Sequence, residues 1–130
     1  MKLTSTGLAH LGLRVTNIAR ARQFYVDTLG FEPLLEAPGT LICNAYGTTL
    51  AFVGGTEQTS DGDRFDPYRV GLDHLALGVT SMSDLEKAKQ DLDHAGVPNN
   101  GIQLDAFSKA NYISFYDPDG IAWELYAMPN

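Results

Sequence analysis

The chain has 130 residues, 44% of them hydrophobic, which is the composition of one globular domain with its own core. Its formal net charge of −7 argues against nucleic acid as a partner, because nucleic-acid binding requires a basic surface. No apolar run is long enough to span a bilayer and no N-terminal signal pattern is visible, so we expect no membrane partner. Cys43 is the only cysteine, which predicts a reducing, cytoplasmic location.

A segment near the start of the sequence is repeated in its second half. Residues 7–16 recur as residues 71–80, with seven of ten positions identical and a constant offset of 64 residues. His10 and His74 occupy the same position of the two copies. A repeat of this kind predicts a duplicated structural unit, and matched histidines predict that both imidazoles point to one pseudo-symmetric centre.

The first copy continues into a predicted helix from about Ile18 to Leu29. Its apolar stripe recurs at steps of three and four residues, and Gly30 is suited to end it because glycine readily takes positive φ. Three strand-like runs follow, at residues 31–36, 41–46 and 49–53. The polar, acidic stretch behind them predicts an exposed linker.

The second copy follows the same order. Ser83 and Glu86 form an S-x-x-E capping box, which predicts a helix start, and Gly96 predicts its end. Strand-like runs follow at residues 102–106, 112–116 and 121–127, with the turn Asp117-Pro118-Asp119-Gly120 before the last of them. Both halves therefore predict a β-α-β-β-β module. Module one covers about 5–56, the linker about 57–68 and module two about 69–128, within one domain of residues 1–130.

The alternation of side chains along a strand predicts where the polar groups point. The branched apolar side chains must face the helices, so His10 and His74 face away from them. Glu124 lies between Trp123 and Leu125 and shares the face of the histidines. A carboxylate on a sheet face is costly to bury unless it is paired or metal-bound. Two imidazoles and one carboxylate form a facial set that holds a divalent ion with open positions.

This pattern leaves two interpretations of the three polar side chains. In the first, His10, His74 and Glu124 bind one divalent ion per site, and Fe²⁺, Mn²⁺, Zn²⁺ and Ni²⁺ all suit those ligands. In the second, the histidines are satisfied by ordinary hydrogen bonds and Glu124 pairs with Arg14.

The sequence resembles the vicinal oxygen chelate superfamily, which includes glyoxalase I, extradiol dioxygenases and bleomycin-resistance proteins. The resemblance covers nearly the whole chain. It is carried by the His-Leu-x-Leu-x-Val opening of each module, by Phe24-Tyr25 with Leu29-Gly30-Phe31, and by residues 115–120 with Glu124 behind them. It implies an α+β fold, in which two tandem β-α-β-β-β modules form an open, curled mixed sheet with the helices on its outer face. It also implies a metal held by His10, His74 and Glu124, and a homodimer.

The chain departs from the well-known activities of that superfamily. Ala51 stands where glyoxalase I has a fourth metal ligand. His94 lies late in the second helix and is expected to be exposed, so it does not replace the acid–base histidine of extradiol dioxygenases. None of the six residues after Glu124 is basic, and Leu104 stands where fosfomycin enzymes carry a lysine, although Ser108 matches a substrate-contacting serine of theirs.

The predicted function is that of a metal-dependent enzyme whose small-molecule substrate chelates the metal through neighbouring oxygens. A lyase- or isomerase-type proton transfer is favoured, with Glu124 as ligand and catalytic base. An extradiol-type dioxygenase and a metal-free, drug-binding protein of the bleomycin-resistance kind are the alternatives. Further residues are candidates for substrate binding; they are Tyr46, Ala51, Ser108, Asn111 and Tyr112. Tyr46, Tyr112 and Tyr116 either line the cavity or are ordinary strand aromatics.

Overall fold

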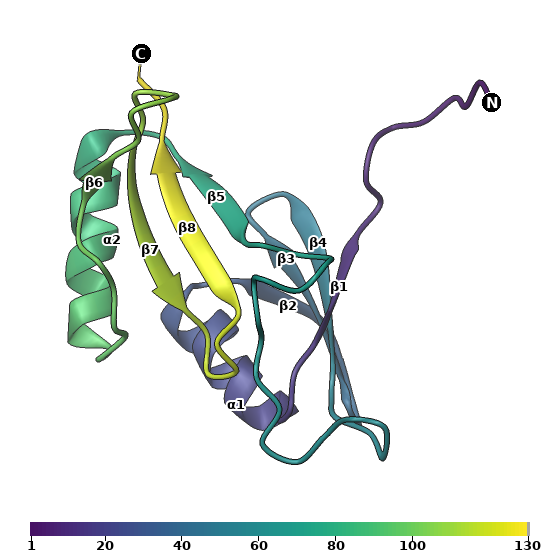
Figure 1. Cartoon of the computed structure of the whole chain (residues 1–130). Coiled ribbons are helices and arrows are strands. Elements are labelled where there is room, and N and C mark those ends of the chain that lie inside the picture. Colours follow the sequence, from purple (N-terminus) through teal and green to yellow (C-terminus); the bar gives the residue numbers. More distant parts are fainter. Residues whose placement is uncertain (130) are drawn as a thin grey trace. The chain divides into compact units, whose positions relative to one another are not determined.

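The computed structural model describes residues 1–129, and Figure 1 shows its helices and strands. The chain divides into two compact units, Met1–Asp63 and Arg64–Asn130, which are described separately. Each unit is a β-α-β-β-β module with one four-stranded mixed sheet that does not close, which confirms the predicted α+β fold class. In the described residues, no helix is both long and apolar enough to cross a membrane.

In the first unit one strand and a helical segment precede three further strands. Its elements are β1 (Leu11–Arg14), α1 (Ile18–Arg22), the π-helix η1 (Gln23–Thr28), β2 (Glu32–Ala37), β3 (Thr40–Ala45) and β4 (Thr48–Val53). The strand order is β1-β4-β3-β2; β1 runs parallel to β4 and the other pairs are antiparallel. The strand β1 therefore lies at an edge of its sheet.

The second unit repeats this topology. Its elements are β5 (Leu75–Val79), α2 (Met82–His94), β6 (Gln103–Leu104), β7 (Asn111–Tyr116) and β8 (Ala122–Ala127). The order is β5-β8-β7-β6, with β5 parallel to β8. The registers agree as well, because Gly12 pairs with Ala51 in the first unit as Ala76 pairs with Glu124 in the second. The sequence repeat is therefore a structural repeat.

The core of the first unit is aromatic. The ring of Tyr25 stacks on Phe52 and Phe31 at centroid distances of 4.2 and 5.7 Å, and Phe24 meets Tyr25 edge-on. The helical segment ends at Thr28, close to the predicted end at Leu29. Its second half is a π-helix, in which the Leu29 amide donates to the Phe24 carbonyl. Both aromatic residues of this segment, Phe24 and Tyr25, are buried.

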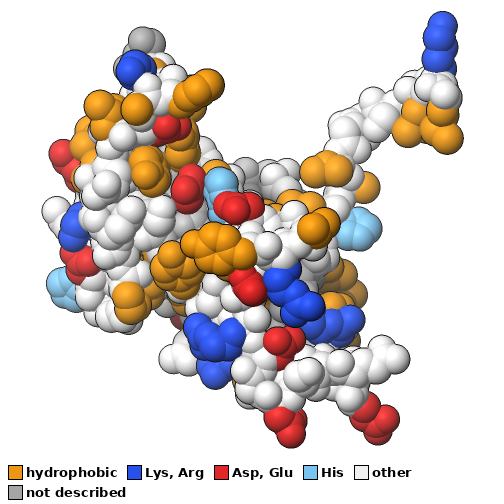
Figure 2. Space-filling view, viewed as in Figure 1, with side chains coloured by type: hydrophobic (Ala, Val, Ile, Leu, Met, Phe, Trp, Pro, Cys, Tyr) orange, Lys and Arg blue, Asp and Glu red, His pale blue; other side chains and the backbone are white. Residues whose placement is uncertain are grey.

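The helix α2 covers one face of the second sheet. Leu85 and Leu92 of α2 and Ile113, Phe115 and Trp123 of the sheet are all buried. Because successive side chains of a strand point to opposite faces, this packing leaves the other face of β8 to the polar Glu124. On the side of the molecule shown in Figure 2, acidic side chains are spread over several places rather than gathered in one patch.

The start of α2 and the length of β6 differ from prediction. The helix starts at Met82, and its cap is Ser81, whose Oγ accepts from the Asp84 amide at 3.1 Å and donates to its carboxylate at 2.6 Å. The predicted box from Ser83 to Glu86 is therefore wrong by two residues. The strand β6 has two residues instead of five, because the Asp105 carboxylate accepts from the Phe107 amide and turns the chain.

We predict that Ser81→Ala destabilises the protein by about 0.5–2 kcal/mol, because the substitution removes the acceptor for the first-turn amide of α2. Ser83→Ala is the matched control: its exposed hydroxyl lies 2.9 Å from the Ser81 hydroxyl but is not the acceptor for the Asp84 amide, so its loss should change the free energy of unfolding by less than about 0.5 kcal/mol. Urea denaturation followed by circular dichroism measures both. A larger loss for Ser83→Ala than for Ser81→Ala would contradict this cap.

Candidate functional site

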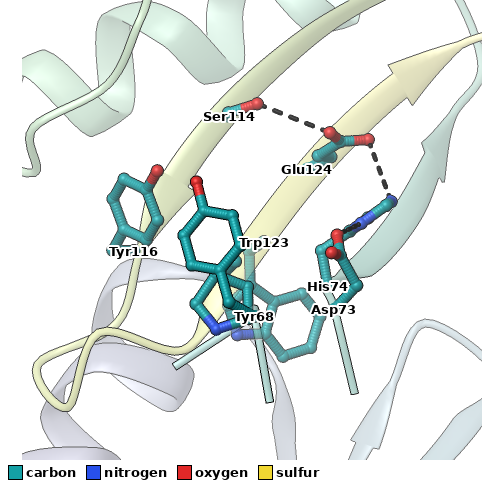
Figure 3. Close-up of a pocket in the computed structure, with 9 residues that line it drawn as sticks. Tyr68, Asp73, His74, Ser114, Tyr116, Trp123 and Glu124 are labelled. Carbon is teal, nitrogen blue, oxygen red and sulfur yellow. Dashed lines mark hydrogen bonds and ion pairs between the residues drawn. The ribbon is translucent and has the colours of Figure 1, made fainter. Parts of the chain in front are cut away.

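The second unit has a pocket on the sheet face opposite α2. Its volume is about 220 Å³. Residues of the segment before β5 and of strands β7 and β8 line it; they are Pro67, Tyr68, Asp73, His74, Ser114, Tyr116, Ala122, Trp123 and Glu124. Figure 3 shows that the carboxylate of Glu124, the hydroxyl of Ser114 and the ring of His74 point toward one another.

Strand pairing brings His74 and Glu124 together. His74 directly precedes β5, two residues before Ala76, which is the partner of Glu124 across the parallel pair. The His74 Nε2 lies 3.5 Å from the Glu124 Oε2, and the Ser114 hydroxyl lies 3.5 Å from the other carboxylate oxygen. The Glu124 side chain is 19% exposed, so an interaction there is less screened by water than one on the open surface.

Asp73 fixes the orientation of the His74 ring. Its Oδ1 lies 2.6 Å from the His74 Nδ1. An ionised carboxylate can only accept, so Nδ1 carries the hydrogen, and in the neutral ring Nε2 presents a lone pair toward Glu124. Metal-binding histidines commonly carry such a carboxylate on their second nitrogen. Sequence reasoning missed Asp73; the available signal was an aspartate directly before His74, where the first copy has Ala9.

The two facing groups fit two positions of one divalent ion. Ligands at the usual bond lengths to a tetrahedral or octahedral ion lie about 3.0–3.4 Å apart, close to the 3.5 Å between the His74 and Glu124 atoms. The same contact is an ion pair when the imidazole is protonated. Within residues 1–129 no group of three or more His, Cys, Asp or Glu side chains is assembled as a metal site.

His10 belongs to the first unit, where it is exposed and directly precedes β1. It thus has the same place relative to its sheet as His74 has in the second unit. The residue that corresponds to Glu124 there is Ala51, as strand pairing shows. The Arg14 guanidinium donates to the Gly54 carbonyl at 2.8 Å within the first unit.

The candidate substrate residues fall into different places. Tyr112 pairs with Tyr126 across β7 and β8, and both share the sheet face of Glu124. Asn111 has the opposite parity in β7, the parity of the buried Ile113, and so points to the face that α2 covers. Its position gives no support to substrate contact.

Tyr46 lies in the first unit, in the turn between β3 and β4. It has a positive φ of 53°, and its hydroxyl donates to the Leu29 carbonyl at 2.7 Å. That bond satisfies a carbonyl at the end of η1 and ties the turn to it. The same hydroxyl comes within 2.7 Å of where a Cβ on Gly30 would lie, so position 30 requires glycine for space as well as for its φ of 75°.

Ser108 takes part in a cluster that sequence reasoning did not identify. Its hydroxyl donates to the Asp105 carboxylate at 2.8 Å and lies 3.1 Å from the hydroxyl of Tyr126. The Tyr126 hydroxyl also donates to that carboxylate. These bonds, the one from Tyr126 foremost and with help from the Phe107 amide, lower the pKa of Asp105 to about 2. The cluster anchors the loop after β6 to β8, on the face that carries Glu124.

The fold and the motifs agree with the comparison with known families. The model of the Glyoxalase/Bleomycin resistance protein/Dioxygenase superfamily matches residues 7–125, and the chain belongs to this superfamily. The protein YaeR of Escherichia coli (strain K12) is 32% identical, over 90% of this chain and 92% of that protein. The trivalent organoarsenical cleaving enzyme of Bacillus sp. (strain MD1) is 26% identical, over 91% of this chain and 71% of the enzyme.

Solved structures share the fold. The glyoxylase/bleomycin resistance protein/dioxygenase domain from Frankia sp. EAN1pec has a TM-score of 0.82 at 26% identity, covering 98% of this chain and 95% of that one. A mutant of the fosfomycin resistance protein FosX from Listeria monocytogenes, complexed with Mn(II) and 1S,2S-dihydroxypropylphosphonic acid, has a TM-score of 0.75 at 19% identity. The alignment covers 97% of this chain and 93% of FosX, and it shows similarity of fold.

We predict that Tyr126→Phe raises the pKa of Asp105 from about 2 toward the ordinary 3.8, because it removes the strongest hydrogen bond to the carboxylate. A lowered pKa stabilises the fold above pH 3.8, and this contribution is lost as the pH falls toward 2. Acid unfolding of the variant should therefore begin at a higher pH. Carboxyl-carbon NMR titration measures the pKa.

The matched control for this prediction is Tyr112→Phe. It alters the stacked neighbour of Tyr126, whose ring centroid is 5.6 Å away, and keeps the bond to Asp105. The control should leave the pKa of Asp105 near 2. An unchanged pKa in Tyr126→Phe would show that this bond does not set it.

Proposed function

We propose that the protein is a metal-dependent enzyme whose small substrate chelates the metal through two neighbouring oxygens. The observation that carries the proposal is the pair of facing groups in the second unit. Asp73 holds His74 with Nε2 directed at the Glu124 carboxylate at 3.5 Å, which is an arrangement suited to a shared cation. His10 would supply the third ligand. Mn(II) in the related fold of FosX supports a divalent ion, and Fe²⁺, Zn²⁺ and Ni²⁺ suit the same ligands.

The chemistry proposed for the site is a proton transfer. A divalent ion held there would act as a Lewis acid on the substrate oxygens. Glu124 would hold the ion through Oε2. Through the oxygen that faces Ser114, it would take a proton from the substrate carbon next to the carbonyl and return it to another atom of the substrate. Oxygen-dependent cleavage is less favoured, because among the described residues that line the pocket His74 is the only histidine.

Cleavage of a trivalent organoarsenical, the activity named for one relative, finds less support in this chain. Trivalent arsenic is a soft centre that favours thiolate ligands. Cys43, the single cysteine, is fully buried in β3, and burial raises the pKa of its thiol. A thiol in that environment is a poor ligand for arsenic.

The cytoplasmic location of the protein also stays a prediction.

We predict that Glu124→Ala and His10→Ala each lower the metal content of protein purified without chelator, at least severalfold, because each removes one of three ligands. Glu86→Ala and His94→Ala are matched controls, since both side chains are exposed on α2. Inductively coupled plasma mass spectrometry measures the content. Equal metal content in Glu124→Ala and Glu86→Ala would refute the site, and equal content in His10→Ala and His94→Ala would remove His10 from it.

We predict a homodimer with two equivalent sites. The strands β1 and β5 are edge strands of their own sheets, and uncovered edges are usually paired or protected. Analytical ultracentrifugation should give twice the 14.1 kDa chain mass at micromolar concentration. A strict monomer under those conditions would contradict the prediction. Restored metal binding in a mixture of His10→Ala and Glu124→Ala chains would show that one site takes ligands from both copies.

The reaction itself is tested with a substrate panel. We expect metal-dependent turnover of an α-hydroxycarbonyl compound without oxygen, accompanied by exchange of the carbon-bound hydrogen with solvent deuterium. Catechols with oxygen, a trivalent organoarsenical and a cationic glycopeptide complete the panel, each with Fe²⁺, Mn²⁺, Ni²⁺ and Zn²⁺. Oxygen consumption would favour the dioxygenase, and tight glycopeptide binding by metal-free protein without turnover would favour drug sequestration.

A further inference from the structure

The pocket of the second unit has an aromatic side that the proposed metal chemistry does not use. Tyr68 and Tyr116 line it together with Trp123. In Figure 3 the phenol rings of Tyr68 and Tyr116 lie on one side of the drawn pocket, away from the contact between His74 and Glu124. Trp123 is buried, whereas Tyr68 is 96% exposed and Tyr116 is 56% exposed. Exposed aromatic rings at the mouth of a pocket are surfaces available to a ligand.

Hydrogen bonds anchor the chain segment that carries Tyr68. The Phe65 amide donates to the Asp119 carbonyl at 2.9 Å, and the Arg64 guanidinium lies 3.4 Å from the Pro118 carbonyl. These contacts attach the segment before β5 to the turn between β7 and β8. The Tyr68 amide then donates to the Asp66 carboxylate at 2.9 Å. The ring of Tyr68 is therefore displayed from an anchored turn.

Tyr116 is the last residue of β7 and leads into the same turn. The buried Asp117 carboxylate accepts from the amides of Asp119 and Ile121 at 2.9 and 2.7 Å, which fixes the turn from inside. The same turn thus positions the backbone of both tyrosines. An anchored backbone lowers the entropic cost of ordering the two rings on a ligand.

The charge of the pocket limits what can lie against these rings. Its lining includes the carboxylates of Asp73 and Glu124, and none of its described lining residues is Lys or Arg. A phosphonate or a second carboxylate on the substrate would be desolvated there without a cation to pair with. An uncharged group meets no such penalty. The volume of about 220 Å³ suffices for one substituted ring, since a cavity of about 150 Å³ can bind benzene.

We propose that the substrate carries a flat, uncharged ring, and that Tyr68 and Tyr116 hold this ring beside His74 and Glu124. The proposal rests on the proposed function for the chelating end of the substrate, while the ring contacts belong to the tyrosines alone. The two tyrosines determine the preference for a ring, while the carboxylates of Asp73 and Glu124 disfavour substrates with a second anionic group.

Three hydroxamates that share one chelating pair of oxygens separate the two ends of the substrate. The probes are benzohydroxamate, acetohydroxamate and the hydroxamate of succinic acid with its free carboxylate. For the metal-loaded full chain, isothermal titration calorimetry should show benzohydroxamate binding about tenfold tighter than acetohydroxamate. The succinic derivative should bind no tighter than acetohydroxamate. A preference for the anionic probe over the ring would overturn the proposal.

Substitutions of the two tyrosines test whether they cause the preference for benzohydroxamate over acetohydroxamate. Tyr68→Ala and Tyr116→Ala should each reduce the preference for the ring to below about threefold, with metal content and acetohydroxamate affinity unchanged. Tyr68→Phe keeps the ring and should keep the preference. Phe107→Ala is the matched control, because Phe107 is 98% exposed and lies outside the pocket lining. An unchanged preference in both alanine variants would overturn the proposal.

A metal-free experiment decides the ring site independently. Benzohydroxamate, and not acetohydroxamate, should shift the aromatic NMR signals of Tyr68 and Tyr116 in chelator-treated protein, and change the emission of Trp123, the only tryptophan. No response to benzohydroxamate would overturn the ring site. Absence of metal from the untreated protein, together with a positive response here, would instead overturn the proposed function and retain the ring site.

Discussion

The packing of β8 against α2 is the constraint on which the site depends. Trp123 and Leu125 are buried on the helix side, and the period of two along a strand then directs Glu124 to the opposite face. A shift of one residue would place the carboxylate in the core, which the free energy cost of burying an unpaired charge opposes. Because β5 is parallel to β8 in fixed register, the same packing also determines how far His74 lies from Glu124.

Duplication repeats the backbone of this arrangement but not its charge. The two parallel strand pairs have equivalent registers, and each is preceded by a histidine. The second unit adds two carboxylates, Asp73 and Glu124, whereas the first has Ala9 and Ala51 at those positions. The first unit therefore has the matching histidine, His10, but neither of the two carboxylates.

Sequence patterns predicted those parts of the protein in which residue types recur at a regular spacing. The repeat and the strand parity were sufficient to place His74 and Glu124 on one face, and the glycine at position 30 marked the end of the first helix. They could not predict the role of Asp73, because its contact depends on side-chain torsions. Nor could they predict Tyr68, which lies in the segment assigned to the linker. Each hydrogen bond that anchors this segment has a backbone group as donor or acceptor, and backbone groups leave no mark in the sequence.

The electrostatics of the pocket connect its polar and aromatic sides. A divalent cation between His74 and Glu124 would be balanced by the carboxylates of Glu124 and Asp73, so the loaded site would hold little net charge. A neutral or singly charged chelating substrate preserves that balance, whereas a second anionic group would disturb it. The tyrosines can bind a ring through dispersion and burial of apolar area, which add no charge. An uncharged aromatic side is thus compatible with the charge of the polar side.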